Sequence, residues 1–97
     1  MRLIIASPDS ALLDVSEVDW VNIRLADGSP ISIYTNHAPL VALHAECSLK
    51  YRLNGQVFEQ PITQGVLSIT HNTVKCLVQG NPVKPADKIN QKEKNKE

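Results

Sequence analysis

The sequence predicts an all-β fold: a two-sheet antiparallel β-sandwich of about ten short strands, followed by a disordered polar C-terminal tail. Apolar and polar side chains alternate with a period of two in several segments, which is typical of strands that bury one face. Turn-forming residues separate these segments about every 8–12 residues, and no segment shows a convincing helical period. Short strands at this spacing are typical of antiparallel sandwiches and barrels.

Two segments show the alternation most clearly. Between residues 18 and 25 the odd positions are apolar from Val21 onward, so Trp20 is expected on the polar side or at a bulge. Between residues 47 and 53 the odd positions are apolar from Leu49 onward, so Tyr51 is expected to point inward. The predicted strands are residues 3–6, 11–13, 18–25, 30–34, 40–43, 47–53, 56–60, 65–70 and 74–78.

The segments between these strands carry residues suited to turns. Asn54-Gly55 is the strongest hairpin signal, because both residues tolerate positive φ angles. Residues 7–10 and 26–30 combine proline with Asp and Ser, and residues 71–73 are expected to join the last two strands. Pro61 is expected to end or bend the strand after the hairpin, since proline cannot donate to a sheet ladder.

Composition divides the 97 residues into one domain, residues 1–83, and a tail, residues 84–97. The domain carries five Lys or Arg against seven Asp or Glu, and the tail five Lys against three acids, so their net charges are −2 and +2. A slightly acidic body lacks the basic footprint of a nucleic-acid-binding protein. The tail is too polar to bury the surface that ordering requires, so we expect it to be disordered.

No apolar run approaches the roughly 20 residues that a membrane-spanning helix needs, and the apolar start at residues 3–6 is too short for a signal-peptide core. A cytoplasmic location is therefore expected. Cys47 and Cys76 lie 29 positions apart, which matches no short zinc-binding spacing. We expect two buried, reduced thiols, with a single disulfide across the sandwich as the alternative.

The stretch at residues 34–40 lies between two apolar runs and contains His37, Ala38 and Pro39. Pro39 forbids a helix through it and pushes the preceding residue to extended geometry, so the stretch is expected to be a corner between strands. His37 would be displayed at this corner. A solvated surface histidine is the ordinary interpretation of such a side chain.

Three stretches together resemble the N-terminal β-sandwich domain of the epsilon subunit of F-type ATP synthases. They are Ser7-Pro8 followed by residues 17–21, the His-Ala-Pro-Leu sequence at residues 37–40, and Gly65 with the apolar residues that follow it through Cys76. The resemblance covers residues 2–80. It implies two packed five-stranded sheets and a place in the central stalk of the rotor, on the cytoplasmic face of the plasma membrane as a peripheral part of the complex.

The resemblance also implies partners and contact residues. The family binds the gamma subunit through the sandwich and touches the ring of membrane c subunits at one end. His37, with Ala38 and Pro39, matches the loop on the c-ring side, and Ser7 matches a position near gamma. Such a subunit couples ATP synthesis or hydrolysis to ion transport without catalytic residues, cofactor or metal of its own, and it reaches the membrane only through the complex.

The chain departs from the family pattern in three places. Residues 29–32 replace a turn that carries an acidic ring contact in the family, and Gln64 and Val66 replace a glycine and an aromatic residue beside Gly65. The family's C-terminal helical hairpin, which restrains ATP hydrolysis, has no counterpart, because the residues after Val83 have no apolar stripe. We therefore expect a minimal or divergent epsilon subunit without that restraint.

Two other classes of function remain open at this stage. A small enzyme could draw on His37, His44, His71, Cys47 and Cys76, but no nucleophile motif or phosphate-binding glycine loop frames them. A metal site at His44, Glu46 and Cys47 would need side chains that strand alternation separates, with His44 and Glu46 on one face and Cys47 on the other. A stand-alone ligand- or peptide-binding sandwich would need aromatic side chains for its cleft, and the chain has four: Trp20, Tyr34, Tyr51 and Phe58.

Overall fold

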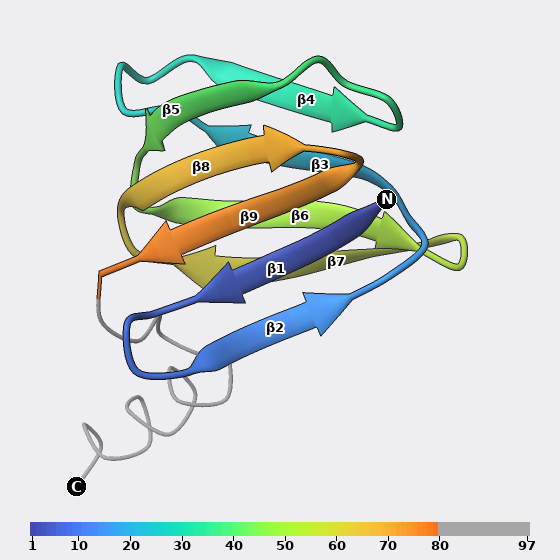
Figure 1. Ribbon diagram of the computed structural model, residues 1–97, viewed down its shortest axis with the longest axis horizontal. Coiled ribbons are helices and arrows are strands. Elements are labelled where there is room, and N and C mark those ends of the chain that lie inside the picture. Colours follow the sequence, from blue (N-terminus) through green and yellow to red (C-terminus); the bar gives the residue numbers. More distant parts are fainter. Residues whose placement is uncertain (80–97) are drawn as a thin grey trace, which may run out of the picture.

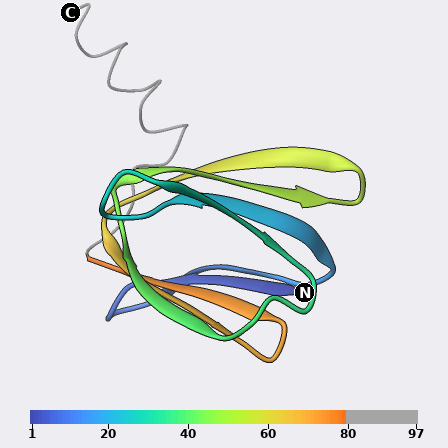
Figure 2. The same ribbon diagram turned by 90° about the horizontal axis from the view of Figure 1, so that it is seen from above.

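The computed structural model describes residues 1–79, which form nine strands in two sheets packed face to face (Figures 1 and 2). The first sheet has five strands in the order β2-β1-β9-β8-β5, and the second has four in the order β4-β3-β6-β7. The strands are β1 (Arg2–Ala6), β2 (Ala11–Val15), β3 (Val18–Arg24), β4 (Pro30–Tyr34), β5 (Leu40–His44), β6 (Cys47–Leu53), β7 (Gln56–Ile62), β8 (Gly65–Thr70) and β9 (Thr73–Val78).

The predicted all-β sandwich is confirmed, with two differences in detail. The described residues hold nine strands rather than about ten, and the second sheet has four strands where the family resemblance implied five. One strand pair, β1 with β9, is parallel, while the other pairs are antiparallel. An isolated bridge between Leu25 and His44 joins the end of β3 to the end of β5, so the two sheets touch at this edge.

The core lies between the sheets and consists of the inward positions that the alternation predicts. Trp20 follows a bulge between Val18 and Trp20, which lets Val18 and Val21 both face inward, and Tyr51 is buried as expected. Tyr51 stacks on Phe58 with ring centroids 5.4 Å apart. The buried apolar residues are Leu3, Ile5, Val18, Val21, Ile23, Ile33, Leu49, Tyr51, Ile62, Leu67, Ile69, Val74, Cys76 and Val78.

Of the two outcomes expected at Pro61, an end or a bend of the strand, the end is wrong. Pro61 pairs with Ser48 and the ladder continues to Ile62. Proline is tolerated here because β7 is an edge strand, so Pro61 needs no donor on its open side. The predicted end of the domain at residues 80–83 and the predicted disorder of residues 84–97 lie outside the described residues.

Turns from distant parts of the chain meet at the two ends of the sandwich. At one end, which we call the His37 end, the backbone N–H of Arg2 donates to the carbonyl of Asn72 at 2.9 Å, and the side chain of Asn72 reaches the loop before His37. The opposite end, the Ser7 end, holds the turn after β1 and the starts of β6 and β8 (Figure 1). Since β1 spans the distance between them at about 3.3 Å per residue, the two ends lie roughly 17 Å apart.

Candidate functional site

The outer face of the five-stranded sheet carries a row of exposed apolar side chains. Leu43 on β5 pairs with Val66 on β8, Val66 pairs with Leu77 on β9, and Leu77 pairs with Ala6 on β1. Because these residues are in register and alternate with inward ones, their side chains lie side by side across the sheet. We call Leu43, Val66 and Leu77 the apolar row; they are 63%, 38% and 46% exposed.

The outer face of the four-stranded sheet carries two ion pairs beside the exposed side chains of Tyr34 and Val57. Lys50 lies 3.8 Å from Glu59, and Arg52 lies 3.7 Å from Asp19. Such half-exposed pairs contribute little to stability but keep a surface solvated. The five-stranded sheet also carries an ion pair on its outer face, between Arg2 and Asp14 at 2.7 Å. Its distinguishing feature is the apolar row in register on three neighbouring strands, which resembles an uncovered interface.

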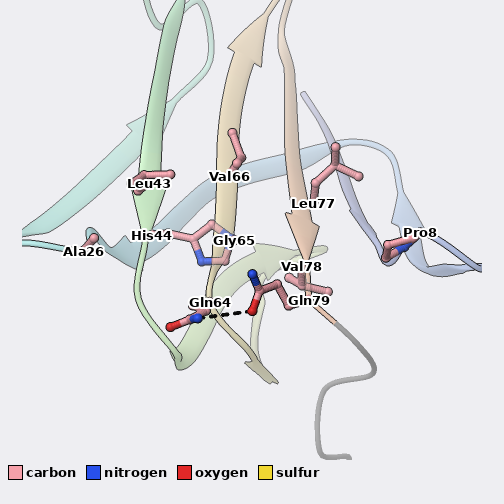
Figure 3. A pocket seen from close by; sticks show the side chains of 10 residues that line it. All are labelled: Pro8, Ala26, Leu43, His44, Gln64, Gly65, Val66, Leu77, Val78 and Gln79. Atoms are coloured by element: carbon pink, nitrogen blue, oxygen red, sulfur yellow. Dashed lines mark hydrogen bonds between the residues drawn. The ribbon is translucent and has the colours of Figure 1, made fainter.

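A hollow of about 630 Å³ opens at the Ser7 end of the apolar row (Figure 3). Its rim includes the side-chain amides of Gln64 and Gln79, which are hydrogen-bonded to each other at 3.2 Å. The residues around it come from the β1–β2, β3–β4 and β7–β8 turns, from the end of β5, the start of β8 and the end of β9 with the residue after it: Pro8, Ala26, Leu43, His44, Gln64, Gly65, Val66, Leu77, Val78 and Gln79.

Gly65 allows β8 and β9 to approach closely beside this hollow. A Cβ atom at this position would collide with the backbone carbonyl of Leu77. Only glycine fits at position 65. This steric requirement explains why a glycine comes directly before the apolar residues of β8.

His44 is the buried polar side chain of this region, only 1% exposed. Its Nδ1 lies 3.1 Å from the carbonyl oxygen of Ala45. A carbonyl oxygen only accepts, so Nδ1 carries the proton and donates to it. Burial lowers the pKa of His44 below its usual value, and the bond to Ala45 acts weakly in the opposite direction, so the ring is neutral at pH 7. Nε2 is buried and has no hydrogen-bond partner among the described residues.

Ser7 lies close to the hollow but is itself buried. Its backbone N–H donates to the carbonyl of Ser10 at 2.9 Å, and its hydroxyl donates to the same oxygen at 3.4 Å. Ser7 thus shapes the turn, and the next residue, Pro8, is the one that faces the hollow.

His37 lies at the other end, in the corner that the sequence predicts. Its side chain is half-buried, with Nδ1 at 2.7 Å from the carbonyl of Ala38, while Ala38 and Pro39 are exposed. The corner is tied to the β8–β9 turn, because Asn36 N–H donates to Asn72 Oδ1 at 2.6 Å and Asn72 Nδ2 donates to Asn36 Oδ1 at 3.0 Å. The predicted contact residues His37 and Ser7 therefore fall at opposite ends of the sandwich.

The remaining sequence candidates do not form a joint site. Cys47 and Cys76 are free thiols, and Cys47 is half-buried rather than buried, because it starts β6 at an end of the sandwich. His44 is buried while Glu46 is exposed, so the expectation that they share a face is wrong; β5 ends at His44, and alternation does not continue through the turn to β6. Within residues 1–79, no three His, Cys, Asp or Glu side chains group closely enough to hold a metal ion.

Sequence reasoning missed the apolar row and the unpartnered ring nitrogen Nε2 of His44. Leu43, Val66 and Leu77 occupy outward positions of apolar strands, and an apolar residue at an alternation position that should be polar is the signal that could have found them. No comparable signal marks the unpartnered Nε2, since it depends on how two sheets meet.

A two-sheet sandwich that exposes a row of apolar side chains across three strands is typical of a docking domain in a larger assembly. The family model "ATP synthase, Delta/Epsilon chain, beta-sandwich domain" matches residues 1–81, so the chain belongs to this family. In the described residues no helix is long and apolar enough to cross a membrane.

Known relatives agree with this assignment. The ATP synthase epsilon chain of Symbiobacterium thermophilum is 31% identical over 77 residues, which cover 79% of this chain and 55% of that protein. The chain thus spans about half the length of this curated relative.

Solved structures share the fold. A chain in the central stalk/c-ring structure of Tetrahymena thermophila mitochondrial ATP synthase aligns with a TM-score of 0.65 and 12% identity, covering 99% of this chain and 89% of that one. A chain in the OSCP/F1/c-ring structure of Euglena gracilis mitochondrial ATP synthase aligns with a TM-score of 0.73 and 17% identity, covering 96% of this chain and 61% of that one.

Proposed function

We propose that the chain is a non-catalytic central-stalk subunit of an F-type ATP synthase and binds the gamma subunit through the apolar row and its hollow. The observation that carries this proposal is the apolar row. Apolar side chains from three neighbouring strands lie uncovered and in register on the outer face of the five-stranded sheet. Burying such a face against a partner is the main favourable contribution available to a domain of this kind.

The c ring is the second proposed partner, at the His37 end. Half-buried His37 and exposed Ala38 and Pro39 form a corner that two hydrogen bonds between Asn36 and Asn72 hold in place. Ser7 and Pro8 lie at the other end, beside the proposed gamma contact. This separation lets one small domain hold two partners at once, as a coupling subunit must.

In this proposal the chain couples ATP synthesis or hydrolysis to ion transport from the cytoplasmic face of the plasma membrane, which it reaches only through the complex. Residues 1–97 alone are expected to couple without restraining hydrolysis, because the residues after Val83 lack the apolar stripe of a helical hairpin.

Reconstitution with the cognate F-type complex lacking its epsilon subunit tests the proposal. Gamma binding, ATP hydrolysis and ion transport would be measured before and after the chain is added. We expect micromolar or tighter binding to gamma and more ion transport per ATP hydrolysed. Failure to bind gamma would refute the proposal, and strong inhibition of hydrolysis would refute the expectation for residues 84–97.

A stand-alone ligand-binding module is the second candidate, and the hollow favours it. Its volume of about 630 Å³ lies within the range of small-molecule sites, and most of the side chains around it are apolar. Screening small apolar compounds by thermal shift, with Leu77→Asp as the control, separates this function from subunit binding.

A further inference from the structure

Lys75 places a positive charge in the middle of the outer face that carries the apolar row. It lies on β9, the central strand of the five-stranded sheet, two residues before Leu77 and on the same outward side. Its neighbours in register are Ser68 on β8 and Ile4 on β1, and Ser68 pairs in turn with Val41, which is 74% exposed on β5. We call Val41, Ser68, Lys75 and Ile4 the second row; it runs beside the apolar row on the same face.

The ammonium group of Lys75 has no hydrogen-bond or ion-pair partner among the described residues, although every other Lys and Arg side chain within residues 1–79 has one. The other charges that the strands place on this outer face, Arg2 and Asp14, are bonded to each other at 2.7 Å. The face therefore keeps one unbalanced positive charge in a domain whose net charge is −2. The cations with partners are Arg2 with Asp14, Arg24 with the carbonyl of Gly28, Lys50 with Glu59 and Arg52 with Asp19.

A partner that covers the apolar row also covers Lys75. A specific interface engages about 20–30 residues on each side, far more than the apolar row supplies, so it extends onto the second row. From β9 both edges of the sheet lie two strands away, about 10 Å. The four-carbon stem of a lysine is shorter than this distance, so the ammonium group loses water when the face is covered.

We propose that the gamma subunit covers the apolar row and the second row together and places an Asp or Glu carboxylate against the ammonium group of Lys75. This inference rests on the proposed function and adds the chemistry of the partner surface: apolar side chains around one carboxylate. Charge complementarity is the argument for this occupant, because a buried cation without a counter-charge strongly opposes binding. The same charge disfavours a partner that presents Lys or Arg at this point.

Calorimetric titration of the gamma subunit with the full 97-residue chain and its Lys75→Met variant tests the inference through the sign of the change. Methionine removes the charge and keeps an unbranched side chain. Because the gamma carboxylate would then be buried without a counter-charge, we expect about tenfold or more weaker binding. Lys75→Glu should weaken binding further, since two carboxylates would face each other. Equal or tighter binding of Lys75→Met would overturn the inference, because it would mean that the ammonium group only adds a desolvation cost.

Lys50→Met is the matched control, since it makes the same substitution on the outer face of the other sheet. Lys50 is half-exposed and lies 3.8 Å from Glu59 of its own chain. The Lys50→Met variant should bind gamma as the unmodified chain does. If it weakened binding as much as Lys75→Met does, the effect would come from the net charge of the chain, and the inference would be wrong.

Carbodiimide crosslinking of the unmodified complex gives a second measurement. The reagent activates a carboxylate, and an amine in contact with it then forms an amide bond while the reagent leaves as a urea. We expect mass spectrometry to find Lys75 joined to an Asp or Glu of gamma. Crosslinks from Lys75 only to carboxylates of its own chain, or none, would overturn the inference while leaving the proposed function intact. Absence of gamma binding by the unmodified chain would instead refute the proposed function.

Discussion

At the residue scale, His44 makes the stability of the chain depend on pH. Burial lowers its folded-state pKa below the usual value of 6.5. As the pH falls through the usual pKa of 6.5, the unfolded chain binds a proton at this histidine that the folded chain does not. The free energy of unfolding then decreases, by at most about 1.4 kcal/mol per pH unit, until the folded-state pKa is reached.

Urea denaturation at about pH 7.5 and about pH 5.5 measures the decrease in the free energy of unfolding. This decrease should be smaller in the His44→Met variant. The carboxyls of Asp14 and Asp27 do not interfere. Hydrogen bonds from Arg2 and Ser29 hold their pKa values below the usual 3.8, so their contribution is lost only at lower pH. Equal pH dependence in the unmodified chain and His44→Met would contradict the prediction.

The two cysteines should differ in reactivity toward an alkylating reagent at neutral pH. Burial, with a smaller contribution from the neighbouring Cys47, raises the pKa of the Cys76 thiol to about 12. The thiolate is the reactive form, so Cys76 should stay unmodified in the folded chain, while the half-buried Cys47 reacts. Mass spectrometry would count the labels, and both thiols should react in denaturant. Labelling of neither thiol in denaturant would indicate a disulfide.

At the element scale, the Asn36–Asn72 pair joins the β4–β5 corner to the β8–β9 turn. Both residues have positive φ, at 68° and 58°, so glycine can replace Asn72 without backbone strain. Asn72→Gly removes two hydrogen bonds and should lower the free energy of unfolding by about 1 kcal/mol or more. Amide exchange at Asn36 should become faster, because its N–H loses its acceptor.

Asn54→Gly is the matched control for that experiment. Asn54 also has a positive φ, at 54°, and lies in the β6–β7 turn, outside the hydrogen bonds between Asn36 and Asn72. The Asn54→Gly substitution should change the free energy of unfolding by only a few tenths of a kcal/mol and leave amide exchange at Asn36 unchanged. Equal effects of the two substitutions would show that the asparagine pair does not hold the corner.

Strand positions could be predicted from the sequence because each depends on local alternation and turns. β4, β6 and β8 have the predicted bounds. The alternation predicted Trp20 on the polar side or at a bulge, and the structure has a bulge between Val18 and Trp20. The pairing of β1 with β9 could not be predicted in this way, since no local pattern specifies a parallel neighbour 71 residues away. The presence of Pro61 inside a strand could not be predicted locally either, because the sheet tolerates it only since β7 is an edge strand.

The candidate site was predictable only in part, for a similar reason. The His37 corner follows from Pro39 and its flanking strands, so local sequence places it. The hollow requires the ends of three strands and three turns to meet, and the burial of His44 depends on how the two sheets pack. These are properties of the assembled sandwich.

At the scale of the whole molecule, the two proposed contacts lie at opposite ends of a rigid sandwich. The separation of roughly 17 Å exceeds the Debye length of about 8 Å at physiological ionic strength. A charge introduced at one end should therefore leave binding at the other end unchanged, and substitutions at this distance are expected to act independently.

Paired substitutions test this independence in the reconstituted complex. His37→Glu should reduce ion transport per ATP hydrolysed and leave gamma affinity unchanged, because the charge enters only the corner at the c-ring end. Leu43→Asp should weaken gamma binding by about tenfold or more, because a carboxylate must be desolvated within the apolar row. At concentrations that restore saturation, the Leu43→Asp complex should couple normally. If His37→Glu lowered gamma affinity as much as Leu43→Asp does, the two ends would belong to one contact, and the assignment of separate partners to them would be wrong.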